Sequence, residues 1–307
     1  MKLSVVIPAH NEEGSLTKTV QGLFDTLSKN QIDHEILVIN DNSSDGTEVV
    51  LQKLQSKLTT LRYLNNPPPN GFGFAVRYGL ENFSGDAVAI FMADCSDDPN
   101  DLVRFFNEMS DHGVDCVFGD RWSRGGKTFD YPLVKRLLNR TFNRLVSVCF
   151  GLRYSDVTNA FKLYRADVIE GLKPFLSHHF NLTLELPLKA IIRGYTFRVL
   201  PNSWTNRKEG IAKLKIREMG SRYLFILVYC LIEKWLSRGD YHSENTKNPR
   251  SKANLSKKVS LTNTSTRSSS GVNNADFAQT SNSNHLGADP LSVKIREAEK
   301  TTWTIQT

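Results

Sequence analysis

Short apolar runs alternate, along the first 239 residues, with longer segments whose apolar positions recur every three or four residues. The short runs are rich in Val, Ile and Leu and end at Pro, Asn or Asp, which is typical of buried strands. They cover residues 2–8, 34–41, 61–66, 86–94 and 116–121. The helical spacing covers residues 12–29, 45–58, 72–83 and 100–113. This alternation predicts βαβ units and a mostly parallel sheet covered by helices on both faces.

The composition changes near residue 240. From residue 240 to residue 307, 28 of 68 residues are Ser, Thr or Asn, and few are large and apolar. Such a segment cannot bury enough apolar surface to offset the entropy lost on ordering. We therefore predict one folded domain over residues 1–239 and a low-complexity, disordered tail over residues 240–307. Residues 291–305 could instead form a short helix or a docking segment.

Charge and cysteine content narrow the classes of function. The chain has 39 Lys and Arg residues against 32 Asp and Glu residues, a net charge of +7. This mild surplus suits anionic phosphates or lipid headgroups, and no nucleic-acid-binding motif accompanies it, so no nucleic-acid partner is expected. Four cysteines without a C-x-x-C pair favour a reducing, cytoplasmic location. The longest apolar run, 223–232, is shorter than the roughly 20 residues of a membrane-spanning helix, so none is expected.

Polar residues directly follow four of the predicted strands. They are residues 10–13, 41–45, 94–98 and 120–121. The carboxyl ends of parallel strands meet at one edge of a sheet, so these four sets should converge on one cleft. The same residue types also form turns and helix caps, and for Asp45 a capping role is at least as well supported.

Five motifs, in order over about residues 3–239, resemble those of the inverting family 2 glycosyltransferases and, more narrowly, their dolichyl-phosphate mannosyltransferase-like branch. The motifs cover residues 8–12, 38–47, 119–121, 156–162 and 207–214. The resemblance implies a nucleotide-binding α/β fold of the type called GT-A, with a nucleoside diphosphate sugar as donor. It also implies that Pro8, His10, Glu12 and Asp41 hold the base and the ribose, and that Asp94 contacts the nucleotide. His10 stands where this family usually has tyrosine, and Asn40 stands in place of the first aspartate of a pair.

The largest departure from the family pattern lies in the metal motif, M-D-A-D-L-Q-x-P, which here reads M-A-D-C-S-D-D-P over residues 92–99. The two expected aspartates become Ala93 and Cys95. Mg²⁺ or Mn²⁺ prefers hard oxygen ligands and keeps water and phosphate oxygens, so Asp94 and Asp97 could still hold it. Asp98 could be a third ligand or contact the acceptor, and Cys95 is expected to be a packing residue. A degenerate or metal-independent cleft is the alternative.

The transfer would release a diphosphate, whose charge must be neutralised as the bond to the sugar breaks. By resemblance and by charge, Arg121, Arg207 and Lys213 fit that role, and Gly210 would let their segment close over the phosphates. A hydroxyl acceptor would need a general base, for which the candidates are the aspartates Asp98, Asp120 and Asp156. A polyprenyl phosphate is already ionised and needs none. Asp156 could equally cap the turn that follows it.

Two apolar segments suggest contact with a membrane surface. Residues 132–150 carry Arg136, Arg140 and Arg144 on one helical stripe, and residues 217–236 surround the longest apolar run with aromatic and basic residues. Both could lie at a bilayer interface, the second as a helix over about residues 215–237, or both could simply pack on the sheet. Residues 178–179 are expected in a loop. Glu185 is expected either near the acceptor or in helix packing.

The sequence therefore predicts a glycosyltransferase that is peripheral on the cytoplasmic face of a membrane. It would move a sugar from a nucleoside diphosphate sugar, such as GDP-mannose, to a polyprenyl phosphate. The transfer would invert the configuration of the sugar and would use Mg²⁺ or Mn²⁺. One alternative is transfer to a saccharide hydroxyl in surface polysaccharide assembly. Others are a catalytically silent nucleotide-sugar-binding subunit and a basic lipid-binding module. Because no spanning helix is predicted, a membrane-protein partner is a further expectation.

Overall fold

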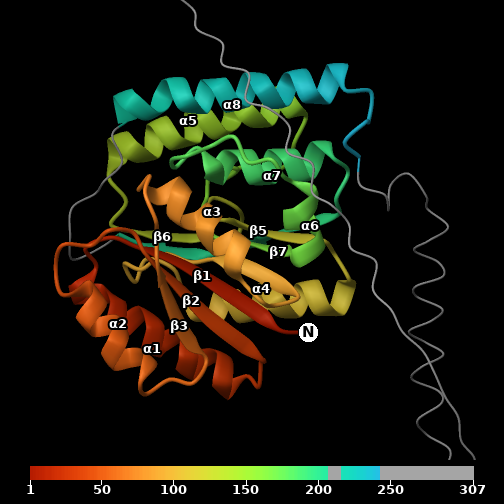
Figure 1. Cartoon of the computed structure of the whole chain (residues 1–307). Helices are drawn as coiled ribbons and strands as arrows, with labels where there is room; N and C mark the ends of the chain where they lie inside the picture. Colours follow the sequence, from red (N-terminus) through yellow and green to blue (C-terminus); the bar gives the residue numbers. More distant parts are fainter. Residues whose placement is uncertain (207–215, 243–307) are drawn as a thin grey trace, which may run out of the picture. The chain divides into compact units, whose positions relative to one another are not determined.

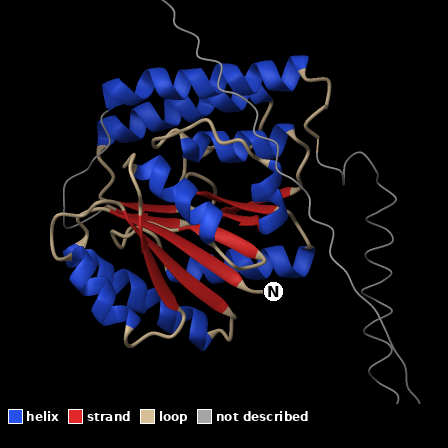
Figure 2. Cartoon of the chain, viewed as in Figure 1, coloured by secondary structure: helices blue, strands red, loops and turns tan. Residues whose placement is uncertain are grey.

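The computed structural model of the chain describes residues 1–206 and 216–242, all within one compact unit. Its centre is a seven-stranded sheet with the order β3-β2-β1-β4-β7-β5-β8, shown in red in Figure 2. The strands are β1 (Leu3–Ala9), β2 (His34–Asn40), β3 (Leu61–Asn65), β4 (Ala87–Ile90), β5 (Cys116–Asp120), β7 (Lys162–Arg165) and β8 (Phe197–Pro201). β7 runs antiparallel to its neighbours β4 and β5, while the other pairs are parallel. The predicted mostly parallel α/β sheet is confirmed.

The alternation of side chains along the strands builds two apolar cores, one on each face of the sheet. In β1, Leu3, Val5 and Ile7 face one core, and Val6 faces the other. The first core is covered by α1 (Glu13–Lys29), α2 (Thr47–Gln55) and α4 (Pro99–His112). The second is covered by α3 (Phe72–Asn82), α6 (Ala166–Gly171), α7 (Leu182–Ile192) and parts of the long helices α5 (Leu133–Phe150) and α8 (Ile216–Leu236). In Figure 1, α5 and α8 lie beyond α7, on the side away from the sheet.

Four strands were missing from the sequence prediction: β7, β8 and the two-stranded sheet of β6 (Lys127–Phe129) and β9 (Ser203–Thr205). All four are only three to five residues long, too short for a periodic pattern to stand out. β4 also ends at Ile90 rather than at the predicted residue 94, because the chain turns into a loop there. This loop carries the altered metal motif.

The polar turns at the ends of three strands share one backbone feature. Asn11 after β1, Asn42 after β2 and Cys95 after β4 have φ values of 53°, 54° and 58°. Asn often adopts this left-handed conformation, whereas Cys does so rarely. These tight turns bring the residues that follow the three strands to the same edge of the sheet.

The helix predicted over about residues 215–237 is present as α8 (Ile216–Leu236), and its interfacial location stays a prediction. Within residues 1–206 and 216–242, no helix is both long enough and apolar enough to cross a bilayer. The predicted disordered tail lies outside the described residues from residue 243 onward.

Candidate active site

A cavity of about 870 Å³ opens at the carboxyl ends of β1, β2 and β4 and extends to α5 and α8. Its walls bring together most of the site residues predicted from the sequence. These are Pro8, His10, Glu12, Asp41, Asp94, Asp97 and Arg121. Arg207 and Lys213 lie outside the described residues.

Asp98 takes a different position from the other predicted site residues. It is the N-cap of α4, where its Oδ1 accepts hydrogen bonds from the backbone N and the Nδ2 of Asn100, both at 2.9 Å. It lines a smaller cavity of about 530 Å³, which shares Ser96 and Asp97 with the main cavity, and does not line the main cavity itself. This geometry favours a capping role for Asp98 over a catalytic one.

The end of the cavity near β2 is organised around Asp41, which is 6% exposed. Its carboxylate accepts hydrogen bonds from the backbone N of Gly71 at 2.9 Å and from the side-chain amides of Asn66 and Asn70 at 2.8 and 3.3 Å. The ring of His10 donates from Nδ1 to the carbonyl oxygen of Asp41 at 2.6 Å, since a carbonyl can only accept. These bonds fix a rigid polar wall on which a flat ring and a ribose could rest.

The loop after β4 places two carboxylates in one buried place. Asp94 Oδ1 accepts a hydrogen bond from the backbone N of Ser96 at 3.1 Å, and Asp97 Oδ2 accepts one from the backbone N of Met92 at 3.3 Å. Burial, together with the nearby charge of Asp94, raises the pKa of Asp97 to about 7. A cation beside these two buried carboxylates would favour the ionised form of Asp97.

The donor atoms in this loop fit Mg²⁺ or Mn²⁺, although they do not complete a coordination shell. Asp94 and Asp97 offer hard oxygen ligands, and within the described ranges no cluster of three His, Cys, Asp or Glu side chains gathers as a metal site. The remaining positions would belong to water and phosphate oxygens. Cys95 points elsewhere, with its Sγ 3.2 Å from Thr19 Oγ1 and 3.5 Å from the carbonyl oxygen of Ser15. It packs against α1, as expected.

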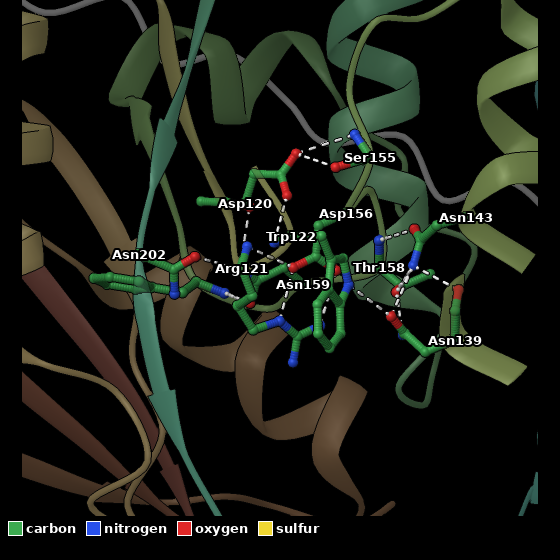
Figure 3. A network of polar contacts seen from close by, with 12 residues as sticks. Asp120, Arg121, Trp122, Asn139, Asn143, Ser155, Asp156, Thr158, Asn159 and Asn202 are labelled. Carbon is green, nitrogen blue, oxygen red and sulfur yellow. Dashed lines mark hydrogen bonds and ion pairs between the residues drawn. The ribbon is translucent and has the colours of Figure 1, made fainter. Parts of the chain in front are cut away.

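Arg121 is held in a fixed orientation at the wall of the cavity (Figure 3). Its Nε and Nη2 donate to the two carboxylate oxygens of Asp156 at 2.7 and 2.8 Å, and its backbone N donates to Asp156 at 3.0 Å. The rings of Trp122, Tyr131 and Trp204 surround the guanidinium, with their centroids 5.6–5.9 Å from its carbon. Burial acts to lower the pKa of Arg121, but Asp156 outweighs it and the pKa is raised.

The structure assigns structural roles to two of the three candidate general bases. Asp156 is fully buried and paired with Arg121, so it is a positioning residue rather than a base or a simple cap. Asp120 accepts hydrogen bonds from the backbone N atoms of Trp122, Ser123 and Ser155 and from the hydroxyl of Ser155, which ties the loop after β5 to the chain before β7. Neither carboxylate is placed to take a proton from an acceptor.

Sequence reasoning missed the far end of the cavity, which lies between α5 and α8. Several polar and aromatic side chains line it: Tyr131, Lys135, Asn139, Thr158, Thr183, Trp204, Arg222 and Tyr223. The predicted arginine stripe on α5 does not form this wall, because the residues that line the cavity, Lys135 and Asn139, each come one position earlier in the chain than an arginine of the stripe. Arg136 and Arg140 lie over the ring of Trp122, at 5.4 and 5.8 Å from its centroid, instead of lining the cavity. The four-residue spacing of Lys135 and Asn139 was the available signal.

The remaining polar residues of the sequence prediction also have clear places. Glu185 and Lys189 form a fully buried ion pair of 2.5 Å within α7, and Glu185 accepts two backbone hydrogen bonds from the preceding loop. Glu185 therefore serves helix packing. His178 lies in that loop and stacks on Phe74 of α3, and its neighbour His179 lines the cavity.

A mostly parallel central sheet flanked by helices is the fold of GT-A glycosyltransferases. The solved structure of glucosyl-3-phosphoglycerate synthase from Mycobacterium tuberculosis, in complex with Mn²⁺, UDP-glucose and phosphoglyceric acid, has this fold. It matches with a TM-score of 0.57 and 17% identity, over 75% of this chain and 79% of that chain.

Residues 4–172 match the family described as Glycosyl transferase family 2, and the chain belongs to that family. It is therefore a glycosyltransferase. Among curated relatives, the undecaprenyl-phosphate mannosyltransferase of Micrococcus luteus is 24% identical over 76% of this chain and 96% of its own length. The polyprenol monophosphomannose synthase of Mycolicibacterium smegmatis is 27% identical over 68% of this chain and 80% of its own length.

Proposed function

We propose that this glycosyltransferase transfers mannose from GDP-mannose to the phosphate of a polyprenyl phosphate, with inversion, at the cytoplasmic face of a membrane. The observation that carries the proposal is the continuity of the main cavity. It runs from the polar wall at Asp41, past Asp94 and Asp97, to Lys135 and Arg222 beside α5 and α8. The names of the two curated relatives, an undecaprenyl-phosphate mannosyltransferase and a polyprenol monophosphomannose synthase, support the same acceptor class and sugar.

The chemistry needs one bond to form as another breaks. An oxygen of the acceptor phosphate attacks the anomeric carbon, and the bond from that carbon to the diphosphate breaks on the opposite face, which inverts the configuration. An ionised phosphate needs no general base, in keeping with the hydrogen-bonded carboxylates of Asp120 and Asp156. A divalent cation held by Asp94 and Asp97 would supply charge neutralisation for the departing diphosphate.

The chain's own residues would orient the reactants. Arg121 presents a permanent positive charge whose direction is set by Asp156, so little reorganisation is needed when negative charge develops nearby. Lys135 and Arg222 would attract the acceptor phosphate at the other end of the cavity. Arg207 and Lys213, which lie outside the described residues, are proposed to contact the diphosphate.

The outer helices present an apolar surface suited to lipid. On α5, Leu133 is 79% exposed and Val148 73%, and on α8, Phe225 is 60% exposed and Trp235 66%. Contiguous exposed apolar residues of this kind mark interaction surfaces, and basic residues beside them favour anionic headgroups. We propose that this surface places the cavity at the bilayer, where a membrane protein could add to the anchoring.

The test is transfer of radiolabelled mannose from GDP-mannose to a short-chain polyprenyl phosphate, with Mn²⁺ and with chelator. We expect an acid-labile product that enters the organic phase only with Mn²⁺. Lys135→Ala should lower kcat/KM for the acceptor about tenfold, the loss expected for one charge-assisted contact.

The matched control is Arg144→Ala, on the same helix but outside the cavity, which should leave kcat/KM unchanged. Label that appears in a water-soluble saccharide instead would favour the hydroxyl-acceptor alternative. Nucleotide binding without consumption of any donor would favour a catalytically silent subunit.

A further inference from the structure

The carboxylate loop lacks an oxygen ligand at the position where the family motif has its second aspartate. Cys95 stands at that position, and its Sγ faces Thr19 of α1 rather than the main cavity. A divalent cation in this cavity would therefore have Asp94 and Asp97 as its carboxylate ligands from the loop. The structure offers one further oxygen there.

Ser96 is held between these two aspartates and is 3% exposed. Its backbone N donates to Asp94 Oδ1 at 3.1 Å, and its carbonyl oxygen accepts from the backbone N of Thr205 in β9 at 2.9 Å. The backbone of Ser96 is thus fixed from both sides. The residue lies in the wall between the two cavities: it lines the main cavity together with Asp94 and Asp97, and the smaller cavity together with Asp97.

The hydroxyl of Ser96 is covered from solvent and has no hydrogen-bond partner among the described residues. Buried polar atoms are nearly always paired, so an unpaired one in the loop that carries two buried carboxylates calls for an explanation. Serine and threonine hydroxyls are hard oxygen donors that bind Mg²⁺ beside nucleotide phosphates in other folds. Both the position of Ser96 in this loop and the chemistry of its hydroxyl are those of a cation ligand.

We propose that the Ser96 hydroxyl is the third protein oxygen of the cation site, in place of the aspartate that Cys95 replaces. This inference rests on the proposed function, because it concerns the cation that accompanies the donor's diphosphate. A neutral hydroxyl leaves the site with two carboxylate charges from Asp94 and Asp97, which one divalent cation balances. Tight binding of the cation should therefore depend on the phosphate oxygens of the nucleotide.

The experiment measures Mn²⁺ binding to the full chain by electron paramagnetic resonance, with and without GDP. In the unsubstituted protein, GDP should tighten Mn²⁺ binding at least tenfold. Ser96→Ala should weaken Mn²⁺ binding in the presence of GDP about tenfold, while GDP binding in the presence of EDTA stays unchanged. Ser96→Asp should tighten Mn²⁺ binding in the absence of nucleotide, and should raise the melting temperature only when Mn²⁺ is added.

The matched control is Cys95→Ser, which places a hydroxyl on the neighbouring residue that faces α1. It should leave Mn²⁺ binding unchanged. Equal Mn²⁺ affinity of Ser96→Ala and the unsubstituted protein would overturn the inference. So would a loss of GDP binding in EDTA as large as the loss of Mn²⁺ binding, because the hydroxyl would then contact the phosphate rather than the cation. An unsubstituted protein that transfers mannose but binds no Mn²⁺ overturns the inference and leaves the transfer activity standing.

Discussion

At the scale of single residues, the site depends on charges that are buried and balanced by one another. Arg121 and Asp156 form such a pair at the cavity wall, and Lys162 of β7 lies buried near both. The sequence placed Arg121 in the site but left the role of Asp156 open. Arg121 and Asp156 are 35 residues apart in the chain, and only the fold brings their charges together. No local sequence pattern could therefore have paired them.

Lys162 gives the stability of the chain a pH dependence that can be measured. Burial lowers the pKa of Lys162 to about 7, with Arg121 acting in the same direction and Asp156 against it. The folded chain then binds fewer protons than the unfolded chain from about pH 7 up to the ordinary lysine pKa near 10.4. The free energy of unfolding should therefore rise with pH in this window.

The measurement is urea unfolding of the chain and of Lys162→Met at several pH values. Between about pH 7.5 and pH 9, the free energy of unfolding should rise by about 1–2 kcal/mol more in the unsubstituted protein than in Lys162→Met. Equal pH slopes in the two proteins would mean that Lys162 keeps an ordinary pKa in the folded state.

At the scale of elements, the site depends on how closely loops approach helices. The loop that carries His178 and His179 packs on the start of α3, where a Cβ at Gly73 would lie 2.3 Å from a backbone carbon of His178. The sequence predicted α3 and the loop separately. It held no signal that the two would meet, because that contact joins residues about 100 positions apart.

Gly73→Ala should therefore displace this loop, which also lines the cavity through His179 and Phe180. We expect the free energy of unfolding to fall by about 1–3 kcal/mol, as for other overpacked sites, and the KM for the donor to rise. The matched control is Gly22→Ala in α1, where a Cβ meets no atom within 4 Å. That change should stabilise the chain by roughly 0.5–1 kcal/mol. Similar effects of the two changes on urea unfolding would contradict the close packing at Gly73.

At the scale of the whole molecule, most of the exposed large apolar side chains of the described residues lie on α5 and α8, the two helices at the far end of the cavity. The sequence predicted both helices and their amphipathic character. It could not decide which of their apolar residues pack inward, because the helical spacing leaves both faces apolar in part. The structure buries Val146 and Ile226 and exposes Leu137 and Phe225.

Charges introduced on that surface should weaken binding to membranes without unfolding the chain. Leu137→Glu combined with Phe225→Glu should lower partitioning into vesicles that contain anionic lipid at least tenfold, because both side chains must enter the interface. Val49→Glu, at another exposed apolar position but on α2, should have no effect. Sedimentation with vesicles measures the partitioning, and equal binding of the three proteins would rule out this surface as the contact.

Several features of this protein follow from the sequence by itself. The alternation of apolar runs and helical spacing determined the class of fold, and polar residues at the ends of four strands marked the edge that carries the site. These signals are local, since they arise from residues close together in the chain. The motifs in order also pointed to the family that the comparison then established.

The tertiary structure decided what local pattern cannot encode. It turned Cys95 toward α1, buried the hydroxyl of Ser96 without a hydrogen-bond partner among the described residues, and paired Arg121 with Asp156. It also brought Lys135 and Arg222, from helices far apart in the sequence, to one end of the cavity. Each of these outcomes depends on contacts between distant segments, whose geometry is set by the packing of helices on both faces of the sheet.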